Sequence, residues 1–175
     1  MTSSELTALP GGALDGLGSR VGAVLRGDHL GQGLRVAVAC ALFNGGITWR
    51  LLEGALDGLA DCGVDRLDVK VAWVPGAFEL PLVARALADG MADAVIALGA
   101  VIRGDTGHYD FVAGECAAGL QRVQLDSGRP VVFGVLTTDT VDQALVRSLP
   151  DESNKGREAA MTAVEMARLL RSAMI

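Results

Sequence analysis

The chain has 175 residues, of which 50% are hydrophobic and 21% are charged, and this length is enough for one well-packed domain. Its net charge of −6 and pI near 4.8 argue against binding to nucleic acid or to an anionic membrane surface, both of which require clustered Lys and Arg. The mean hydropathy of +0.37 is high, yet no apolar run approaches the ~18 residues of a membrane span, so we expect apolar surface to be buried between subunits and small molecules to be the other partners.

The first nineteen residues are rich in Gly, Ser and Thr and show no sustained period. They predict a flexible leader over 1–19, followed by a single domain over 20–175. Because this end of the chain has neither a basic segment nor the apolar core of an export signal, we expect a cytoplasmic protein. Cys40, Cys62 and Cys116 have no disulfide or metal-ligand spacing and are expected to be reduced thiols in the core.

Four apolar runs without polar alternation follow in chain order, at 34–43, 69–74, 93–102 and 130–137. Runs of this kind predict strands that are covered on both faces. Helical patterns lie between and after them. Alternating strands and helices imply an α/β fold, a three-layer sandwich in which helices flank a four-stranded parallel sheet.

Two of the helical patterns are well defined. The first, ended by Gly63, places six apolar residues on one stripe: Ile47, Leu51, Leu52, Ala55, Leu56 and Leu59. The second begins at Asn154, a plausible N-cap. Its apolar side contains Ala160, Ala163, Val164, Ala167, Leu170 and Met174.

Unusual residues follow each predicted strand, where the ligand sites of parallel sheets lie. The four stretches are 43–46, 75–79, 101–111 and 137–140. Because the carboxyl ends of parallel strands share one edge, we expect these loops to converge there. Neither a P-loop nor a dinucleotide-binding fingerprint occurs among them, which disfavours nucleotide binding.

Several residues of these loops have two interpretations. Phe43 could belong to the core or serve as a stacking platform. Glu79 lies in an apolar context and needs partners such as ligand hydroxyls. His108 could be a helix-cap or surface histidine, but the neighbouring glycines would let the backbone approach a ligand. Arg147 and Lys155 could be solvated cations, although Lys155 opposes a helix dipole unless an anion binds nearby.

Five motifs, in this order, resemble the 6,7-dimethyl-8-ribityllumazine synthase family. They are FN at 43–44, VPGAFELP at 74–81, LGAVIRGDTGHYDFV at 98–112, PVVFGVLTTD at 130–139, and Arg147 followed by NKG at 154–156. The resemblance covers roughly residues 21 to 172. It implies a flavodoxin-like fold and the condensation of 5-amino-6-(D-ribitylamino)uracil with 3,4-dihydroxy-2-butanone 4-phosphate, with no cofactor and no metal.

The resemblance also implies roles for individual residues. His108 would transfer protons, Phe43 would stack on the pyrimidine, and Arg147 and Lys155 would bind phosphate, with Glu158 orienting Arg147. Phe133 would come from the neighbouring subunit. The remaining substrate-binding residues are Asn44, Ala77, Phe78, Glu79, Ala100, Val101, Ile102, Asp105 and Thr106, of which Asp105 would contribute only its backbone.

Members of this family form pentamers, and some assemble further into sixty-subunit shells, so the resemblance implies a homopentamer or a multiple of it. Riboflavin synthase is a further candidate partner. The acidic connection 148–153 leaves the size of the assembly open. The alternative function is that of a catalytically silent relative that forms shells or binds flavin. The joint presence of Phe43, Glu79, His108, Arg147 and Lys155 favours the enzyme.

Overall fold

A computed structural model describes residues 12 and 14–174 of the chain. Its strands are β1 (Val36–Ala41), β2 (Val69–Val74), β3 (Ala94–Ile102) and β4 (Val131–Thr138). Its α-helices are α2 (Gly45–Asp61), α3 (Leu80–Asp89), α4 (His108–Ser127), α5 (Val141–Val146) and α6 (Lys155–Ala173). Short 3-10 turns occupy η1 (Asp15–Leu17), η2 (Arg66–Asp68) and η3 (Ala77–Glu79).

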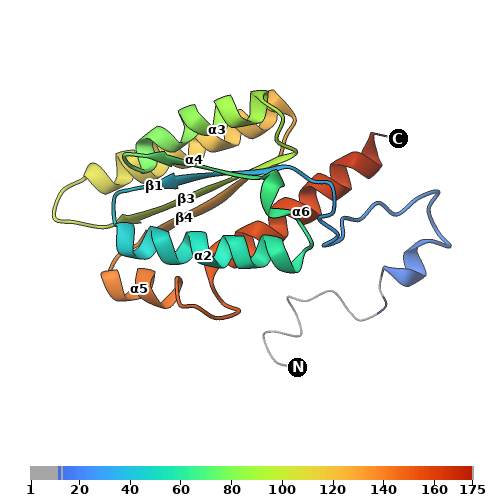
Figure 1. Cartoon of the computed structure of the whole chain (residues 1–175), viewed down its shortest axis with the longest axis horizontal. Coiled ribbons are helices and arrows are strands. Elements are labelled where there is room, and N and C mark those ends of the chain that lie inside the picture. The colour runs from blue at the N-terminus through green and yellow to red at the C-terminus, as the bar shows by residue number, and fades with distance from the viewer. Residues whose placement is uncertain (1–11, 13, 175) are drawn as a thin grey trace.

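The strands form one parallel sheet in the order β2-β1-β3-β4. Helices α3 and α4 cover one face of this sheet, and α2 and α6 cover the other (Figure 1). The predicted three-layer α/β fold with a four-stranded parallel sheet is therefore confirmed. The strand order matches that of the flavodoxin-like fold without its fifth strand.

The central strand β1 is buried on both faces. Val36, Val38 and Cys40 pack toward α2 and α6, whereas the alternate residues, Ala37 and Ala39, pack toward α3 and α4. This is why the run reads as continuously apolar in the sequence. The small alanines on one face let α3 and α4 approach the sheet closely.

Strand β2 does not meet the expectation of burial on both faces. It lies at the edge of the sheet, where Val71 is 39% exposed and Trp73 is 43% exposed. The ring of Trp73 stacks on that of Trp49 from α2, with the ring centroids 6.3 Å apart. The apolar character of β2 thus leaves an aromatic surface uncovered in the single chain.

The two predicted helical stripes are largely buried, with one exception in each. Leu56 of α2 is 38% exposed, because Gly58 instead of Leu56 faces α6. A Cβ added to Gly58 would lie 3.1 Å from the Cβ of Ala160. Met174 is 76% exposed, because α6 extends past the end of the sheet (Figure 1). The predicted N-cap of α6 is confirmed, since Asn154 accepts hydrogen bonds from the backbone of the first helical turn.

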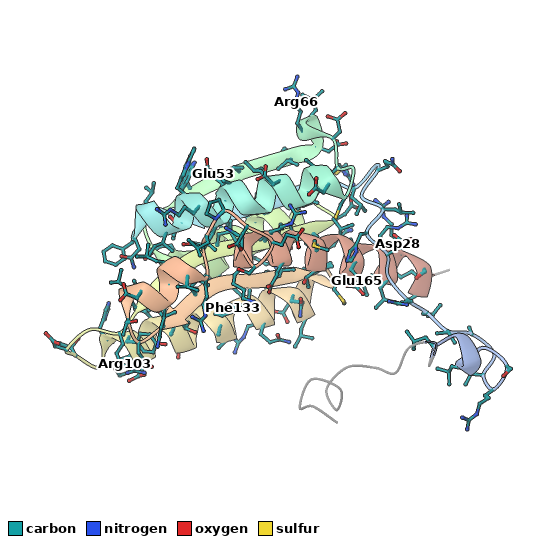
Figure 2. All side chains as sticks on the ribbon, turned by 90° about the horizontal axis from the view of Figure 1, so that it is seen from below. Asp28, Glu53, Arg66, Arg103, Phe133 and Glu165 are labelled. Atoms are coloured by element: carbon teal, nitrogen blue, oxygen red, sulfur yellow. The ribbon has the colours of Figure 1, made fainter. Side chains whose placement is uncertain are left out.

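The chain before β1 crosses the C-terminal half of α6 (Figure 2). Asp28 accepts a hydrogen bond of 2.9 Å from Nε of Arg168, and His29 lies 3.7 Å from Glu165. The backbone N–H of Gly31 then donates to the carbonyl of Cys62. The predicted leader over 1–19 falls mostly outside the described residues.

The three cysteines are all buried and free, as predicted. Burial raises the pKa of the Cys40 and Cys116 thiols to about 11, so neither is a thiolate nucleophile at neutral pH. Within residues 12 and 14–174, no helix has both the length and the apolar composition needed to cross a membrane.

Candidate active site

Three of the predicted loops meet in one open cavity of about 550 Å³. The loops follow β1, β2 and β3, so the cavity lies at the carboxyl edge of the sheet, on the side of α4. Its volume suits a small organic molecule. Its lining consists of Phe43, Gly76, Ala77, Phe78, Glu79, Ala100, Val101, Ile102, Gly104, Thr106, His108, Tyr109, Phe111 and Val112.

Asn44 connects two of these loops. Its backbone has a φ of 57°, the left-handed region that Asn tolerates better than most residues. This conformation lets its Nδ2 donate a 2.8 Å hydrogen bond to the carbonyl of Ala100 at the end of β3. Asn44 therefore supports the wall of the cavity rather than lining it. The preceding residue, Phe43, is 70% exposed and does not belong to the core.

Glu79 is the last residue of the 3-10 turn η3, which follows β2. It is half-buried, so its carboxylate is less desolvated than the apolar sequence around it suggests. The side chain lies against Gly76, where an added Cβ would be 3.2 Å from Oε2 of Glu79. A glycine at this position leaves room for the carboxylate to face the cavity.

His108 is the first residue of α4 and lines the cavity with an exposed side chain. Its backbone N–H donates a long hydrogen bond of 3.4 Å to Oγ1 of Thr106. Gly104 and Gly107 border open space, so the backbone of this loop is accessible to a ligand. Asp105 is exposed but does not line the cavity. The imidazole is thus available to a bound molecule, as an acid–base role requires.

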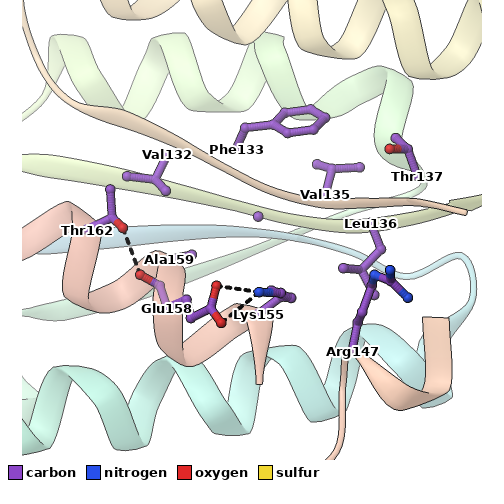
Figure 3. Close-up of a pocket in the computed structure, with 11 residues that line it drawn as sticks. Val132, Phe133, Val135, Leu136, Thr137, Arg147, Lys155, Glu158, Ala159 and Thr162 are labelled. Carbon is purple, nitrogen blue, oxygen red and sulfur yellow. Dashed lines mark hydrogen bonds and ion pairs between the residues drawn. The ribbon is translucent and has the colours of Figure 1, made fainter. Parts of the chain in front are cut away.

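Phe133, Arg147 and Lys155 line a different cavity, of about 320 Å³. Figure 3 shows this cavity between β4 and the first turns of α6, with Arg147 entering from the end of α5. None of these three residues lines the cavity of His108. The expectation that all four loops converge on one site therefore holds for three of them. The fourth loop follows the edge strand β4, and none of its residues lines the cavity of His108.

Glu158 pairs with Lys155 and not with Arg147, contrary to the sequence-based expectation. The ammonium of Lys155 lies 2.7 Å from Oε1 and 2.6 Å from Oε2 of Glu158 (Figure 3). The two residues are one helical turn apart in α6, whereas Arg147 caps α5 and donates to the carbonyl of Gln143. The carboxylate in the first turn of α6 also offsets the unfavourable position of the Lys155 charge.

Five lining residues of the larger cavity are not among the predicted site residues: Gly76 and Gly104, which belong to the predicted loops, and three residues of α4. Tyr109, Phe111 and Val112 all belong to the first turn and a half of α4. Phe111 is 72% exposed and, with the exposed Phe43 and Phe78, gives the cavity an aromatic lining. A prediction that a helix begins at His108 would have identified the three residues of α4, because the first turns of such a helix lie at the same carboxyl edge of the sheet as His108.

A family model described as 6,7-dimethyl-8-ribityllumazine synthase matches residues 33–171 of the chain. The match begins just before β1 and ends in the last turn of α6. It therefore includes the whole sheet and the lining of both cavities.

Proposed function

The chain belongs to the 6,7-dimethyl-8-ribityllumazine synthase family, and we propose that it condenses 5-amino-6-(D-ribitylamino)uracil with 3,4-dihydroxy-2-butanone 4-phosphate. The products would be 6,7-dimethyl-8-ribityllumazine, phosphate and water. Membership of this family implies a role in riboflavin biosynthesis. The observation that carries the proposal is the position of His108 in a cavity of small-molecule size that Phe43 and Glu79 also line.

The pyrimidine substrate would occupy the larger cavity. The exposed ring of Phe43 offers a face for stacking, and the strand end Ala100–Ile102, which also lines the cavity, would present backbone groups to the heterocycle. The ribityl hydroxyls would donate to the half-buried carboxylate of Glu79. The short turn containing Ala77 and Phe78 would close this side of the substrate.

His108 would move protons between intermediates. The reaction joins an amine to a ketone with loss of water, eliminates phosphate and closes a ring, and each step transfers protons near neutral pH. Imidazole is suited to this task, and one well-placed acid–base group typically gives ~10²–10⁴-fold acceleration. The remaining acceleration would come from holding both substrates in a fixed geometry.

The butanone phosphate would bind to Arg147 and Lys155, and this requires a second subunit. These cations and Phe133 line a cavity that His108 does not reach within one chain. We therefore propose that the smaller cavity of one subunit faces the larger cavity of its neighbour, with Asp105 and Thr106 at the phosphate end. The exposed aromatic residues Trp49, Trp73 and Phe111 provide apolar surface for such contacts.

The assembly we propose is a homopentamer or a multiple of it, including a sixty-subunit shell. A cytoplasmic location agrees with three free, buried thiols. Riboflavin synthase is the candidate partner that would use the product. A silent shell-forming or flavin-binding relative is the weaker alternative, because such a protein would have no need of His108 in a cavity and two cations in another.

The proposed function is tested by incubating the purified protein with both substrates and following the absorbance and fluorescence of the lumazine. We expect product to form well above the spontaneous rate measured without protein. The variant Arg85→Lys, altered on the surface between α3 and α4, serves as a matched protein control. A rate equal to the spontaneous one would favour the silent relative.

A further inference from the structure

We infer that Arg103 is a positioning residue that holds His108 at the cavity, an inference that rests on the proposed function. Arg103 follows β3 directly, and four residues separate it from His108 at the start of α4. Figure 2 shows it at the far end of the molecule from Asp28. Its side chain joins the end of β3 to two other parts of the carboxyl edge of the sheet, the loop after β4 and the first turn of α4.

The guanidinium of Arg103 contacts two carboxylates and one aromatic ring. Its Nε donates a 3.0 Å hydrogen bond to Oδ1 of Asp139, in the loop after β4. Its Nη2 and Nη1 lie 3.2 Å and 3.5 Å from the two carboxylate oxygens of Asp110, in the first turn of α4. Its Cζ lies 4.0 Å from the ring centroid of Tyr109, a cation–π distance.

Two of these contacts are to the residues that directly follow His108, the residue proposed to transfer protons. Tyr109 and Asp110 are the next two residues after His108, so Arg103 fixes the first turn of α4 on which the imidazole is carried. The loop 104–107 that leads into this turn is exposed throughout. Arg103 is itself anchored, because its backbone N–H donates a 2.8 Å hydrogen bond to the carbonyl of Thr138 in β4.

The same contacts make Arg103 a poor phosphate ligand. Its hydrogen bonds to Asp110 and Asp139 raise its pKa further above the usual value, so it stays charged. One guanidinium with two carboxylates leaves the group with a net negative charge, which would repel a phosphate. The ring of Tyr109 covers one face of the Arg103 guanidinium. Arg103 therefore acts on the geometry of the site and not by binding the anion.

Arg85 offers a matched control at the other end of α4. Its side chain is 44% exposed, against 43% for Arg103, and it also pairs with two aspartates. It lies 2.7 Å from Asp89 of α3 and 3.8 Å from Asp126 near the end of α4. Arg85→Lys and Arg103→Lys thus weaken the same kind of bridge on the same helix, but only one of the two bridges adjoins His108.

The first test measures backbone hydrogen exchange by mass spectrometry in the assembled protein. Lysine supplies a point charge that cannot reproduce the planar fork of Arg103. We expect Arg103→Lys to speed exchange in residues 104–112 by about tenfold, through local opening of the first turn of α4. Arg85→Lys should leave this segment unchanged. Equal exchange in the two variants would overturn the inference.

The second test is a kinetic cycle with His108→Gln. We expect Arg103→Lys to lower kcat by about tenfold with little change in either KM, since small misplacements of a reacting group can cost up to about 100-fold. If Arg103 acts through His108, Arg103→Lys should have little further effect in the His108→Gln background. Asp139→Asn, which leaves Arg103 and α4 intact, should show a weaker effect in the same direction.

Multiplicative effects of Arg103→Lys and His108→Gln would overturn the inference, as would an equal loss of kcat in Arg85→Lys. The failure of the proposed function is a separate outcome. If the unaltered protein forms no lumazine, the exchange measurement alone decides whether Arg103 fixes the first turn of α4.

Discussion

Nζ of Lys155 lies 2.6 Å from Oε2 of Glu158, so one of the two cations proposed to bind phosphate already has a carboxylate partner. Among the described residues, Arg147 has no carboxylate within ion-pair distance, and its Nη1 donates to the carbonyl of Gln143. A phosphate must compete with Glu158 for Lys155 but not for Arg147. The two cations should therefore contribute unequally to phosphate binding.

Arg147→Ala should raise the KM for the butanone phosphate more than Lys155→Ala does. A hydrogen bond to a charged group contributes about 1.5–3 kcal/mol, so we expect a rise of roughly 10- to 150-fold for Arg147→Ala. Arg147→Lys should recover only part of this loss, because a point charge cannot replace the planar fork. Steady-state kinetics with each substrate varied in turn provide the measurement. An equal rise for both substrates, or dissociation of the oligomer, would count against this role.

Phe43→Ala should have the opposite selectivity. The exposed ring is proposed to stack on the pyrimidine, so its removal should raise the KM for that substrate by roughly 2- to 12-fold, as expected for a stacking contact of about 0.5–1.5 kcal/mol. The KM for the butanone phosphate should change little. Phe43→Tyr, which keeps a ring of similar shape, is the control. If Phe43→Ala raises only the KM for the butanone phosphate, the two substrates have been assigned to the wrong cavities.

His108→Gln should lower turnover by roughly tenfold or more while the pyrimidine still binds. Glutamine keeps a polar side chain at the start of α4 but cannot exchange a proton near neutral pH. The loss should be partial, because positioning of the substrates is retained. The single-turnover rate and the Kd of the pyrimidine, measured separately, check this expectation. An unchanged rate would make His108 a surface residue at the start of a helix.

Asp93→Asn should destabilise the fold at neutral pH by about 2–3 kcal/mol, because it removes a charge that three arginines share. Asp93 is 8% exposed and lies 3.1 Å from Arg171, 3.5 Å from Arg35 and 3.8 Å from Arg129. Burial works to raise the pKa of Asp93, but the hydrogen bond from the Arg35 backbone and the guanidiniums of Arg171 and Arg35 outweigh it and lower that pKa.

The sign of the pH dependence follows from this lowered pKa. The stabilisation from Asp93 is fully present above the pKa of an unfolded aspartate, about 3.9, and is lost as the pH falls through the lower folded pKa. Urea unfolding at pH 7 and at a series of acidic pH values provides the test. The Asn variant should lose less stability on acidification than the unaltered protein. Parallel curves for the two proteins would show that Asp93 does not carry this linkage.

The fold was predictable from the sequence to the extent that burial alone decides it. The run 93–102 corresponds closely to β3, which is central and almost wholly buried, and the run 130–137 corresponds to the edge strand β4, in which Phe133 is 42% exposed. Strand β2 reads the same way, yet one of its faces is open. Residues that meet another subunit and residues that meet the core carry the same apolar signal, so the sequence cannot separate them.

The sequence pointed to most of the residues that line the two cavities, but not to their division between the cavities. The motifs name both His108 and Arg147, but nothing in their spacing indicates that they line two cavities. That division depends on the strand order, which puts β4 at one edge of the sheet. The role of Arg103 was hidden for a similar reason, since its partner Asp139 is 36 residues away in the chain.

The central claim is that each active site combines the larger cavity of one subunit with the smaller cavity of its neighbour. It is tested most directly by co-assembling equal amounts of His108→Gln and Arg147→Ala subunits and measuring lumazine formation at a low concentration of the butanone phosphate. In a randomly mixed ring, about a quarter of the interfaces then join an intact His108 to an intact Arg147.

The matched control co-assembles unaltered subunits with the double variant His108→Gln/Arg147→Ala. Shared sites again give about a quarter of full activity, whereas sites within one chain give about half. We therefore predict about a quarter of full activity in both mixtures, well above either single variant alone. Two results together would contradict a site shared between subunits. The first mixture would be no more active than the average of its two variants, and the control mixture would keep about half of full activity.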